Sequence, residues 1–161
     1  MAKSKEEKTN VMRTLEQKKI PYTAHSYDPE GPIDGVSVAQ TLGQPPEQVF
    51  KTLVTKGASG AYYVFDIPVA ENLDLKKAAK AVGEKSVAML PQKELLPLTG
   101  YVHGGCSPVG MKKQFPTVFH ETVELFDTIC VSAGKIGAQV EVAPADLIAL
   151  LGAQTADVTV E

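Results

Sequence analysis

The segment VFKTLVTKGASGAYYVFDIP, residues 49–68, constrains the fold more than any other part of the chain. Two runs of apolar, β-branched and aromatic residues flank the turn-forming stretch Lys56–Gly60, which is the pattern of a β-hairpin. Side chains alternate between the two faces of a strand, and in the first run both faces are mostly apolar. The segment therefore predicts an antiparallel pair of strands with little polar surface.

Helix and strand signals are interspersed along the rest of the chain. Helices are predicted from a capping box at Ser4 and Glu7 to about residue 19, and over 36–42, 75–82, 92–96 and 144–151. Strands are predicted over 22–27, 86–90, 117–120, 128–132, 139–142 and 156–160. We expect one mixed α/β domain over residues 1–161, with a largely antiparallel or mixed, curved sheet flanked by helices.

Composition limits the partners of such a domain. The net charge of -3 argues against an extended nucleic-acid surface, because neutralising phosphates needs a concentrated basic face. The lysines at 76, 77, 80, 112 and 113 could still form a local basic patch, although a solvated face is the simpler interpretation. The polar N-terminus and the lack of a long apolar run predict neither a signal peptide nor a membrane span, so we expect a cytoplasmic protein.

Lys51 stands at an unusual position in the first strand of the hairpin. It shares one face with Val49 and Leu53, while the other face carries Phe50 and Thr52. A lysine in a strand that is apolar on both sides must reach an edge or meet an anion, because an unpaired buried ammonium is very costly. Lys51 is therefore either an edge lysine that discourages aggregation or a ligand-binding group.

The run GYVHGGCSPVG, residues 100–110, concentrates glycine beside two lysines. It lacks the spacing of a P-loop and is not a convincing dinucleotide fingerprint, so no nucleotide cofactor is expected. Two interpretations remain open. The run is a plain tight turn, or a turn that presents consecutive backbone amides to an anion or a carbonyl.

Side chains with catalytic or metal-binding chemistry are scattered. Cys106 could act as a nucleophile only with a lowered pKa and a base in reach, and its candidate bases are His25, His103 and His120. The histidines and cysteines have no zinc-ligand spacing, so neither a metal nor another cofactor is expected. The carboxylates, Asp66 among them, form no obvious acid–base pair.

Several of these motifs occur in a familiar order. HSYD, PEQVFKTLV, DLKKAAKAVG, GYVHGGCSPVGMKK and VSAGKIGAQVEVAPADL follow one another from about Asn10 to Asp157. In this order they resemble the YbaK/EbsC family of aminoacyl-tRNA deacylases, relatives of the editing domain inserted in bacterial prolyl-tRNA synthetases. The match of VFKTL and of GGxSPxG is specific, whereas the scattered apolar matches are not.

The resemblance implies removal of cysteine from mischarged Cys-tRNA(Pro), without a cofactor, on the acceptor end of the tRNA. It places Lys51 in the substrate pocket, with Thr52 in the same signature and Tyr27 as a pocket aromatic. The glycine loop would border that pocket, and the amides of Gly104 and Gly105 could hold the 3′-terminal adenosine or the ester carbonyl. The remaining expected contacts are Ser107, Pro108 and Gly110.

The family chemistry needs no protein nucleophile, because the cysteine thiol of the substrate can attack its own ester carbonyl. The acidic net charge predicts weak binding to RNA alone, and the resemblance suggests prolyl-tRNA synthetase as a partner. Two departures concern specificity. Some relatives carry an aromatic residue where Ile33 and Asp34 stand, and an acidic residue where Gln139 stands.

Three alternatives to a Cys-tRNA(Pro) deacylase follow from these observations. The same fold could edit another amino acid such as alanine. It could bind tRNA ends or nucleotides as a regulator without turnover. It could also be a cysteine hydrolase that uses Cys106, although relatives carry other residues at that position.

Overall fold

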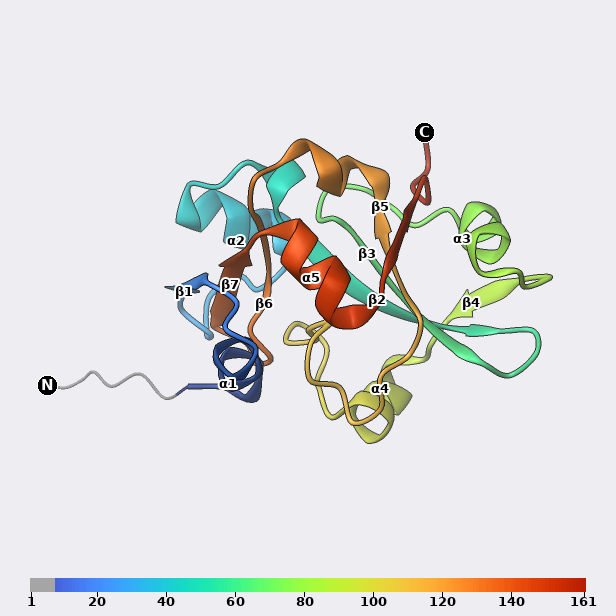
Figure 1. The fold of residues 1–161 in the computed structure, drawn as a ribbon, viewed down its shortest axis with the longest axis horizontal. Coiled ribbons are helices and arrows are strands. Elements are labelled where there is room, and N and C mark those ends of the chain that lie inside the picture. The colour runs from blue at the N-terminus through green and yellow to red at the C-terminus, as the bar shows by residue number, and fades with distance from the viewer. Residues whose placement is uncertain (1–7) are drawn as a thin grey trace, which may run out of the picture.

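The computed structural model describes residues 8–161, which form helices, strands and two 3-10 turns in a mixed order (Figure 1). The predicted capping box at Ser4 and Glu7 lies outside the described residues. The helices are α1 (Asn10–Gln17), α2 (Gly35–Leu42), α3 (Leu75–Val82), α4 (Gln92–Thr99) and α5 (Pro144–Leu151), with 3-10 turns η1 (Pro46–Gln48) and η2 (Glu121–Leu125). The strands are β1 (Tyr22–Ser26), β2 (Phe50–Gly57), β3 (Tyr62–Pro68), β4 (Val87–Met89), β5 (Thr117–His120), β6 (Ile129–Ser132), β7 (Ala138–Val142) and β8 (Gln154–Ala156).

The strands form two sheets rather than one. The larger sheet has the order β4-β2-β3-β5-β8, antiparallel across β4-β2-β3 and parallel across β3-β5-β8. The smaller sheet, β1-β7-β6, is antiparallel throughout. A parallel bridge between Val49 and Cys130 joins them. The mixed α/β class is therefore confirmed, and the separate three-stranded sheet is the feature that the pattern of single strands did not predict.

The predicted hairpin forms its long central ladder. β2 and β3 pair along their whole length, from Phe50 opposite Pro68 to Lys56 opposite Tyr62. The outer edge of β2 is covered only in part, because β4 pairs with residues 55–57 and β6 bridges at Val49. Residues 51–53 therefore lie on a free stretch of strand edge, which is where an open site can form.

Most predicted helices have the expected ends, and three elements differ. α1 begins at Asn10 because the Thr9 side chain caps it by accepting from the Met12 amide, so Lys8 and Thr9 are not part of the helix, and α1 ends at Gln17 rather than at about residue 19. α4 continues to Thr99 instead of ending at residue 96, because Gly100 in the left-handed region (φ 88°) ends the helix and Pro97 is accommodated in its last turn. The last strand covers Gln154–Ala156 instead of 156–160, because it pairs there with β5, while Thr159 makes only an isolated bridge with Leu73.

Two apolar layers hold the elements in place. Val64, Phe119, Val140 and Leu147 belong to the larger cluster, which joins both sheets to α1 and α5. A second cluster around Phe65 packs the other face of the five-stranded sheet against α3. Within residues 8–161, no helix is long and apolar enough to cross a membrane.

Candidate active site

A cavity of about 320 Å³ lies at the free edge of β2. Its wall combines residues from β2, the start of α2, the glycine loop and the smaller sheet, which are far apart in the sequence. Pockets for small ligands range from about 300 to 1,000 Å³, so the cavity has the volume of a small-molecule site. The lining includes Tyr27, Ile33, Asp34, Gly35, Val49, Lys51, Thr52, Leu95, His103, Gly104, Cys106, Ser132 and Gln139.

Lys51 is the cationic group of this cavity. Its side chain is partly buried in the wall, and no carboxylate among residues 8–161 lies within ion-pair distance of it. Burial lowers the pKa of Lys51, and the more distant Glu71 partly opposes this shift. A half-desolvated ammonium without a partner favours an anionic ligand, because such a ligand restores the electrostatic interactions that water supplied.

The backbone of Thr52 faces the same opening. The carbonyl of Val54 accepts a hydrogen bond from the Leu90 amide on the outer side of β2. Backbone groups point to alternate sides along an antiparallel ladder, so the N–H and C=O of Thr52 also point outward. The free strand edge therefore offers one donor and one acceptor to a molecule in the cavity.

The glycine loop supplies further donors. Gly104 lines the cavity in the left-handed region (φ 91°), a conformation that glycine adopts without strain. Among residues 8–161, no backbone oxygen accepts from the N–H groups of Gly104 or Cys106, whereas the Gly105 amide bonds to Val102 within the loop. Free amides beside an ammonium are suited to a carbonyl oxygen that gains negative charge.

A buried carboxyl lies directly behind Thr52. The Thr52 hydroxyl donates a 2.6 Å hydrogen bond to Oδ1 of Asp66, and Asp66 is fully buried in β3. Oδ2 of Asp66 has no hydrogen-bond partner among the described residues. Burial raises the pKa of Asp66 to about 7, although the bond from Thr52 partly lowers it. From the sequence, Asp66 is only one of several carboxylates without an obvious acid–base partner, so its pairing with Thr52 is not predicted.

Comparison with known proteins identifies the family that shares these features. The family model for the aminoacyl-tRNA editing domain matches residues 34–150. The chain belongs to this family. Editing of an aminoacyl-tRNA removes the amino acid from its ester, so the expected enzyme class, an aminoacyl-tRNA deacylase, is confirmed together with the resemblance.

Individual relatives match nearly the whole chain. A protein of Enterococcus faecalis named as the Cys-tRNA(Pro)/Cys-tRNA(Cys) deacylase EbsC is 48% identical over 161 residues, 99% of this chain and 98% of that protein. A solved structure described as a trans-editing enzyme for prolyl-tRNA synthetase is 28% identical, with a TM-score of 0.82 over 94% of this chain and 95% of that chain. A hypothetical protein of solved structure, 22% identical with a TM-score of 0.86 over 94% and 100% of the two chains, shares the fold.

The predicted site residues of the editing domain fall into two groups. The cavity wall contains Tyr27, Lys51, Thr52 and Gly104. Gly105, Ser107, Pro108 and Gly110 do not line it. A Cβ on Gly105 would lie 3.0 Å from the backbone of Lys135 and Ile136, so this glycine allows the loop to pack against the turn between β6 and β7. The residues of this second group belong to the glycine loop but do not line the cavity. Their contact with the substrate stays a prediction.

The two departures from the family pattern both lie at this cavity. Ile33 and Asp34 line it beside the first turn of α2, and Asp34 caps that helix by accepting from the Ser37 amide. Gln139 is buried and exchanges two side-chain hydrogen bonds with Gln44, of 2.7 and 3.2 Å. An acidic side chain at position 139 would present a charge to the cavity, whereas this amide pair keeps that wall neutral.

The predicted basic patch does not form one surface. Lys77 on α3 pairs with Asp157 at 3.1 Å and donates to the Thr159 carbonyl. Lys112 contacts the end of α4, which lies apart from α3 in the fold (Figure 1). Lys76, Lys80 and Lys85 line one small groove at α3 together with Glu84, so the basic surface there is local, which agrees with weak binding of RNA by charge alone.

Replacing Cys106 by alanine is expected to leave deacylation within about twofold of the wild-type rate, because its thiol cannot act as a nucleophile. Burial raises the pKa of Cys106 to about 12, with a smaller effect from Asp66, so the thiol is neutral at pH 7. His25 and His120 have other hydrogen-bond partners, and His103 lines the same cavity as Cys106 without a hydrogen bond to it among the described residues. Single-turnover deacylation by a folded Cys106→Ala variant provides the measurement, and a loss of tenfold or more would restore the cysteine-hydrolase interpretation.

Proposed function

We propose that residues 1–161 act as one trans-editing domain that removes cysteine from mischarged Cys-tRNA(Pro). The observation that carries the proposal is one cavity lined both by Lys51, whose ammonium is unpaired, and by Gly104 and Cys106, whose amides are free. The names of the relatives support the substrate, since one is named for Cys-tRNA(Pro) and Cys-tRNA(Cys) and another for trans-editing. A role on tRNA also agrees with the expected cytoplasmic location.

Each group of the cavity has a proposed task. The amides of Gly104 and Cys106 hold the ester carbonyl and stabilise its developing negative charge. Lys51 binds a phosphate or ribose group of the 3′ end or offsets the same charge. The outward backbone of Thr52 orients the aminoacyl group at the strand edge. Tyr27 provides an aromatic surface in the cavity wall.

Ester cleavage by the substrate thiol suits this set of residues. The sulfur of the bound cysteine forms a C–S bond to its own carbonyl carbon, and the C–O bond to the 3′ oxygen of the tRNA breaks. The thiol proton goes to the leaving oxygen, and the resulting thiolactone is later hydrolysed by water. The protein supplies orientation and charge stabilisation, which agrees with a neutral Cys106 and a buried Asp66.

The thiol requirement is tested with a panel of mischarged tRNAs. Release of cysteine from Cys-tRNA(Pro) is expected to exceed release of serine from Ser-tRNA(Pro) by about 100-fold or more, because the hydroxyl is a far weaker nucleophile at neutral pH. Ala-tRNA(Pro) serves as the comparison without any internal nucleophile. Equal rates on all three substrates would contradict the thiol route, and preference for alanine would assign the other editing specificity.

Prolyl-tRNA synthetase is the proposed partner. The net charge of -3 and the pairing of Lys77 with Asp157 support a requirement for a second protein that brings the tRNA. Adding the synthetase at about 150 mM salt is expected to raise deacylation of Cys-tRNA(Pro) at least tenfold when the tRNA is dilute. An inactive synthetase from which the tRNA-binding surface has been removed is the control. An unchanged rate would exclude the partner and leave the deacylase itself in place.

A further inference from the structure

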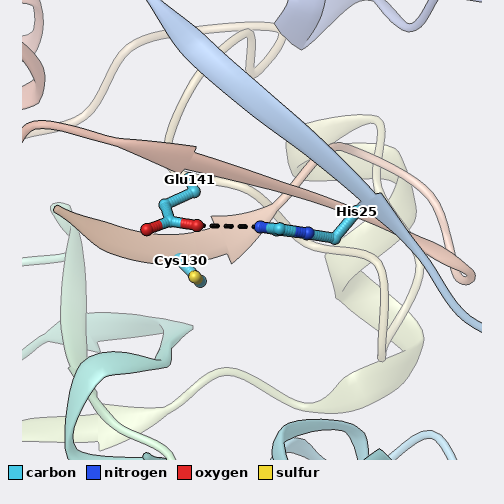
Figure 2. Close-up of side chains that lie close together, drawn as sticks. All are labelled: His25, Cys130 and Glu141. Atoms are coloured by element: carbon cyan, nitrogen blue, oxygen red, sulfur yellow. Dashed lines mark hydrogen bonds and ion pairs between the residues drawn. The ribbon is translucent and has the colours of Figure 1, made fainter. Parts of the chain in front are cut away.

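Three side chains with metal-ligand chemistry gather on one face of the smaller sheet, and none of them lines the cavity. Cys130 on β6 and Glu141 on β7 are directly opposite in the strand pairing. His25 on β1 lies two residues along from the partner of Glu141 and on the same face. Figure 2 shows the His25 imidazole pointing at the Glu141 carboxylate, with the Cys130 thiol beside the same carboxylate.

The geometry of the three donor atoms is close to that of a metal site. Nε2 of His25 lies 2.8 Å from Oε1 of Glu141, and one donor atom from each residue lies within 4.8 Å of the others. Zinc binds nitrogen, sulfur and oxygen ligands at 2.0–2.3 Å, so tetrahedral ligands stand roughly 3.3–3.8 Å apart. Side-chain shifts of about 1 Å or less therefore bring the three atoms to ligand distance, a small change for rotatable side chains.

Supporting hydrogen bonds hold the carboxylate in this orientation. The Thr128 hydroxyl donates to Oε2 of Glu141 at 2.5 Å, which leaves Oε1 turned toward His25. Gln48 in turn donates to the carbonyl of Thr128 at 2.8 Å and to its hydroxyl at 3.2 Å. In metal centres, hydrogen bonds of this kind orient the side chains that bind the metal. A solvent-exposed ion pair does not require them.

Burial differs among the three residues in a way that suits ion entry. Cys130 is 1% exposed and packs with Ala39, Val49 and Val69, so its sulfur lies on the protein side. The side chains of His25 and Glu141 are 28% and 29% exposed, so the opposite side is open to solvent. Burial raises the pKa of the Cys130 thiol to about 12, and a bound zinc ion would displace that proton.

We propose that His25, Cys130 and Glu141 form a binding site for one zinc-like cation, separate from the deacylase cavity. The mixed nitrogen, sulfur and oxygen donors favour zinc over magnesium or calcium, which prefer oxygen ligands alone. Three protein ligands leave a fourth position for water. Because His25 pairs in register with Gln139, which lines the cavity, the ion would join all three strands next to the cavity wall.

The test uses untagged, chelator-treated protein titrated with Zn²⁺ in competition with a chromophoric chelator. One zinc per chain is expected, and Cys130→Ser, His25→Ala and Glu141→Gln are each expected to weaken binding at least about tenfold. Cys106→Ser is the matched control, since Cys106 is also a buried thiol but lies outside the cluster, and it is expected to bind like the wild type. Titration with Co²⁺ adds a spectroscopic signature, because a thiolate ligand produces charge-transfer absorption that Cys130→Ser would abolish.

Folding of each variant is checked by circular dichroism before titration, and Glu141→Gln, at a partly exposed position, provides a variant with little packing to lose. Zinc that binds the wild type and all three ligand variants equally would overturn the proposal, and so would the absence of binding by the wild type. A Cys106→Ser variant that loses zinc as fully as Cys130→Ser would also overturn it. None of these results depends on deacylase activity, so the proposed function is tested independently.

Discussion

Replacing Lys51 by alanine is expected to lower kcat/KM for Cys-tRNA(Pro) at least about 100-fold, equivalent to about 3 kcal/mol of transition-state stabilisation. The ammonium of Lys51 is partly buried in the cavity wall and has no carboxylate partner among residues 8–161. Removing it leaves substrate charge uncompensated in a partly desolvated site. The measurement is the release of cysteine from Cys-tRNA(Pro) at limiting enzyme.

Lys56→Ala is the matched control for this experiment. Lys56 lies on the same strand but is exposed, and its ammonium stands 5.8 Å from the centre of the Tyr62 ring. Activity is expected to be unchanged in this variant, and thermal unfolding is expected to show that Lys51→Ala is folded. Equal turnover by wild type and Lys51→Ala would remove Lys51 from the mechanism. If the wild type binds tRNA but does not turn it over, this result would favour the alternative function of a non-catalytic regulator that binds tRNA ends.

The parts of the fold that could be predicted from the sequence are those with local signals. α2 and α3 each begin at an aspartate whose carboxylate accepts backbone amides, and each ends at a glycine in the left-handed region. These residues are Asp34 with Gly43 (φ 70°) and Asp74 with Gly83 (φ 76°). Capping chemistry acts within one turn of a helix, so a single sequence contains it completely.

The arrangement of the strands could not be predicted in the same way. β1 pairs with β7 more than 100 residues later, and β8 pairs with β5 in parallel. Nothing near either strand in the sequence specifies such a partner, because it depends on which apolar faces can be buried together. The division into two sheets, joined at Val49 and Cys130, is a result of this kind.

The candidate site also contains some residues with a local signal in the sequence and others without one. Strand alternation made the position of Lys51 anomalous and composition made the glycine loop unusual, but each pattern left two interpretations open. The resemblance to the YbaK/EbsC family is what placed both at a substrate pocket. Asp66 had a usable signal, since it is a carboxyl inside the apolar run YYVFDIP and a hairpin register would set it opposite Thr52. The His25, Cys130 and Glu141 cluster had none, because its residues are brought together only by the pairing of three distant strands.

Replacing Asp66 by asparagine is expected to stabilise the protein at pH 8 by up to about 4 kcal/mol, because the buried carboxyl must ionise there and the amide need not. Burial raises the pKa of Asp66 from its ordinary value of 3.8 to about 7. Between these two values the folded state holds a proton that the unfolded state has released. The contribution of Asp66 to stability is therefore fully present below pH 3.8 and is lost as the pH rises through about 7.

Urea unfolding of wild type and Asp66→Asn at several pH values between 5 and 8 measures this difference, which is expected to grow with pH. Asp157→Asn is the control, because a hydrogen bond from Lys77 lowers the pKa of Asp157 from its ordinary value of 3.8, so the effect of this variant is expected to be constant between pH 5 and 8. That group contributes stability above its unfolded pKa and loses it in acid. A difference between wild type and Asp66→Asn that is constant across pH would contradict a buried, titrating carboxyl.

The same variant separates stability from function. The Thr52 hydroxyl donates to Oδ1 of Asp66 at 2.6 Å directly behind the cavity wall, so this acceptor oxygen fixes which way the Thr52 proton points. An asparagine can present its nitrogen instead of its oxygen to Thr52, and deacylation is therefore expected to fall about tenfold while stability rises. An Asp66→Asn variant that is both more stable and fully active would show that Asp66 is dispensable for the reaction.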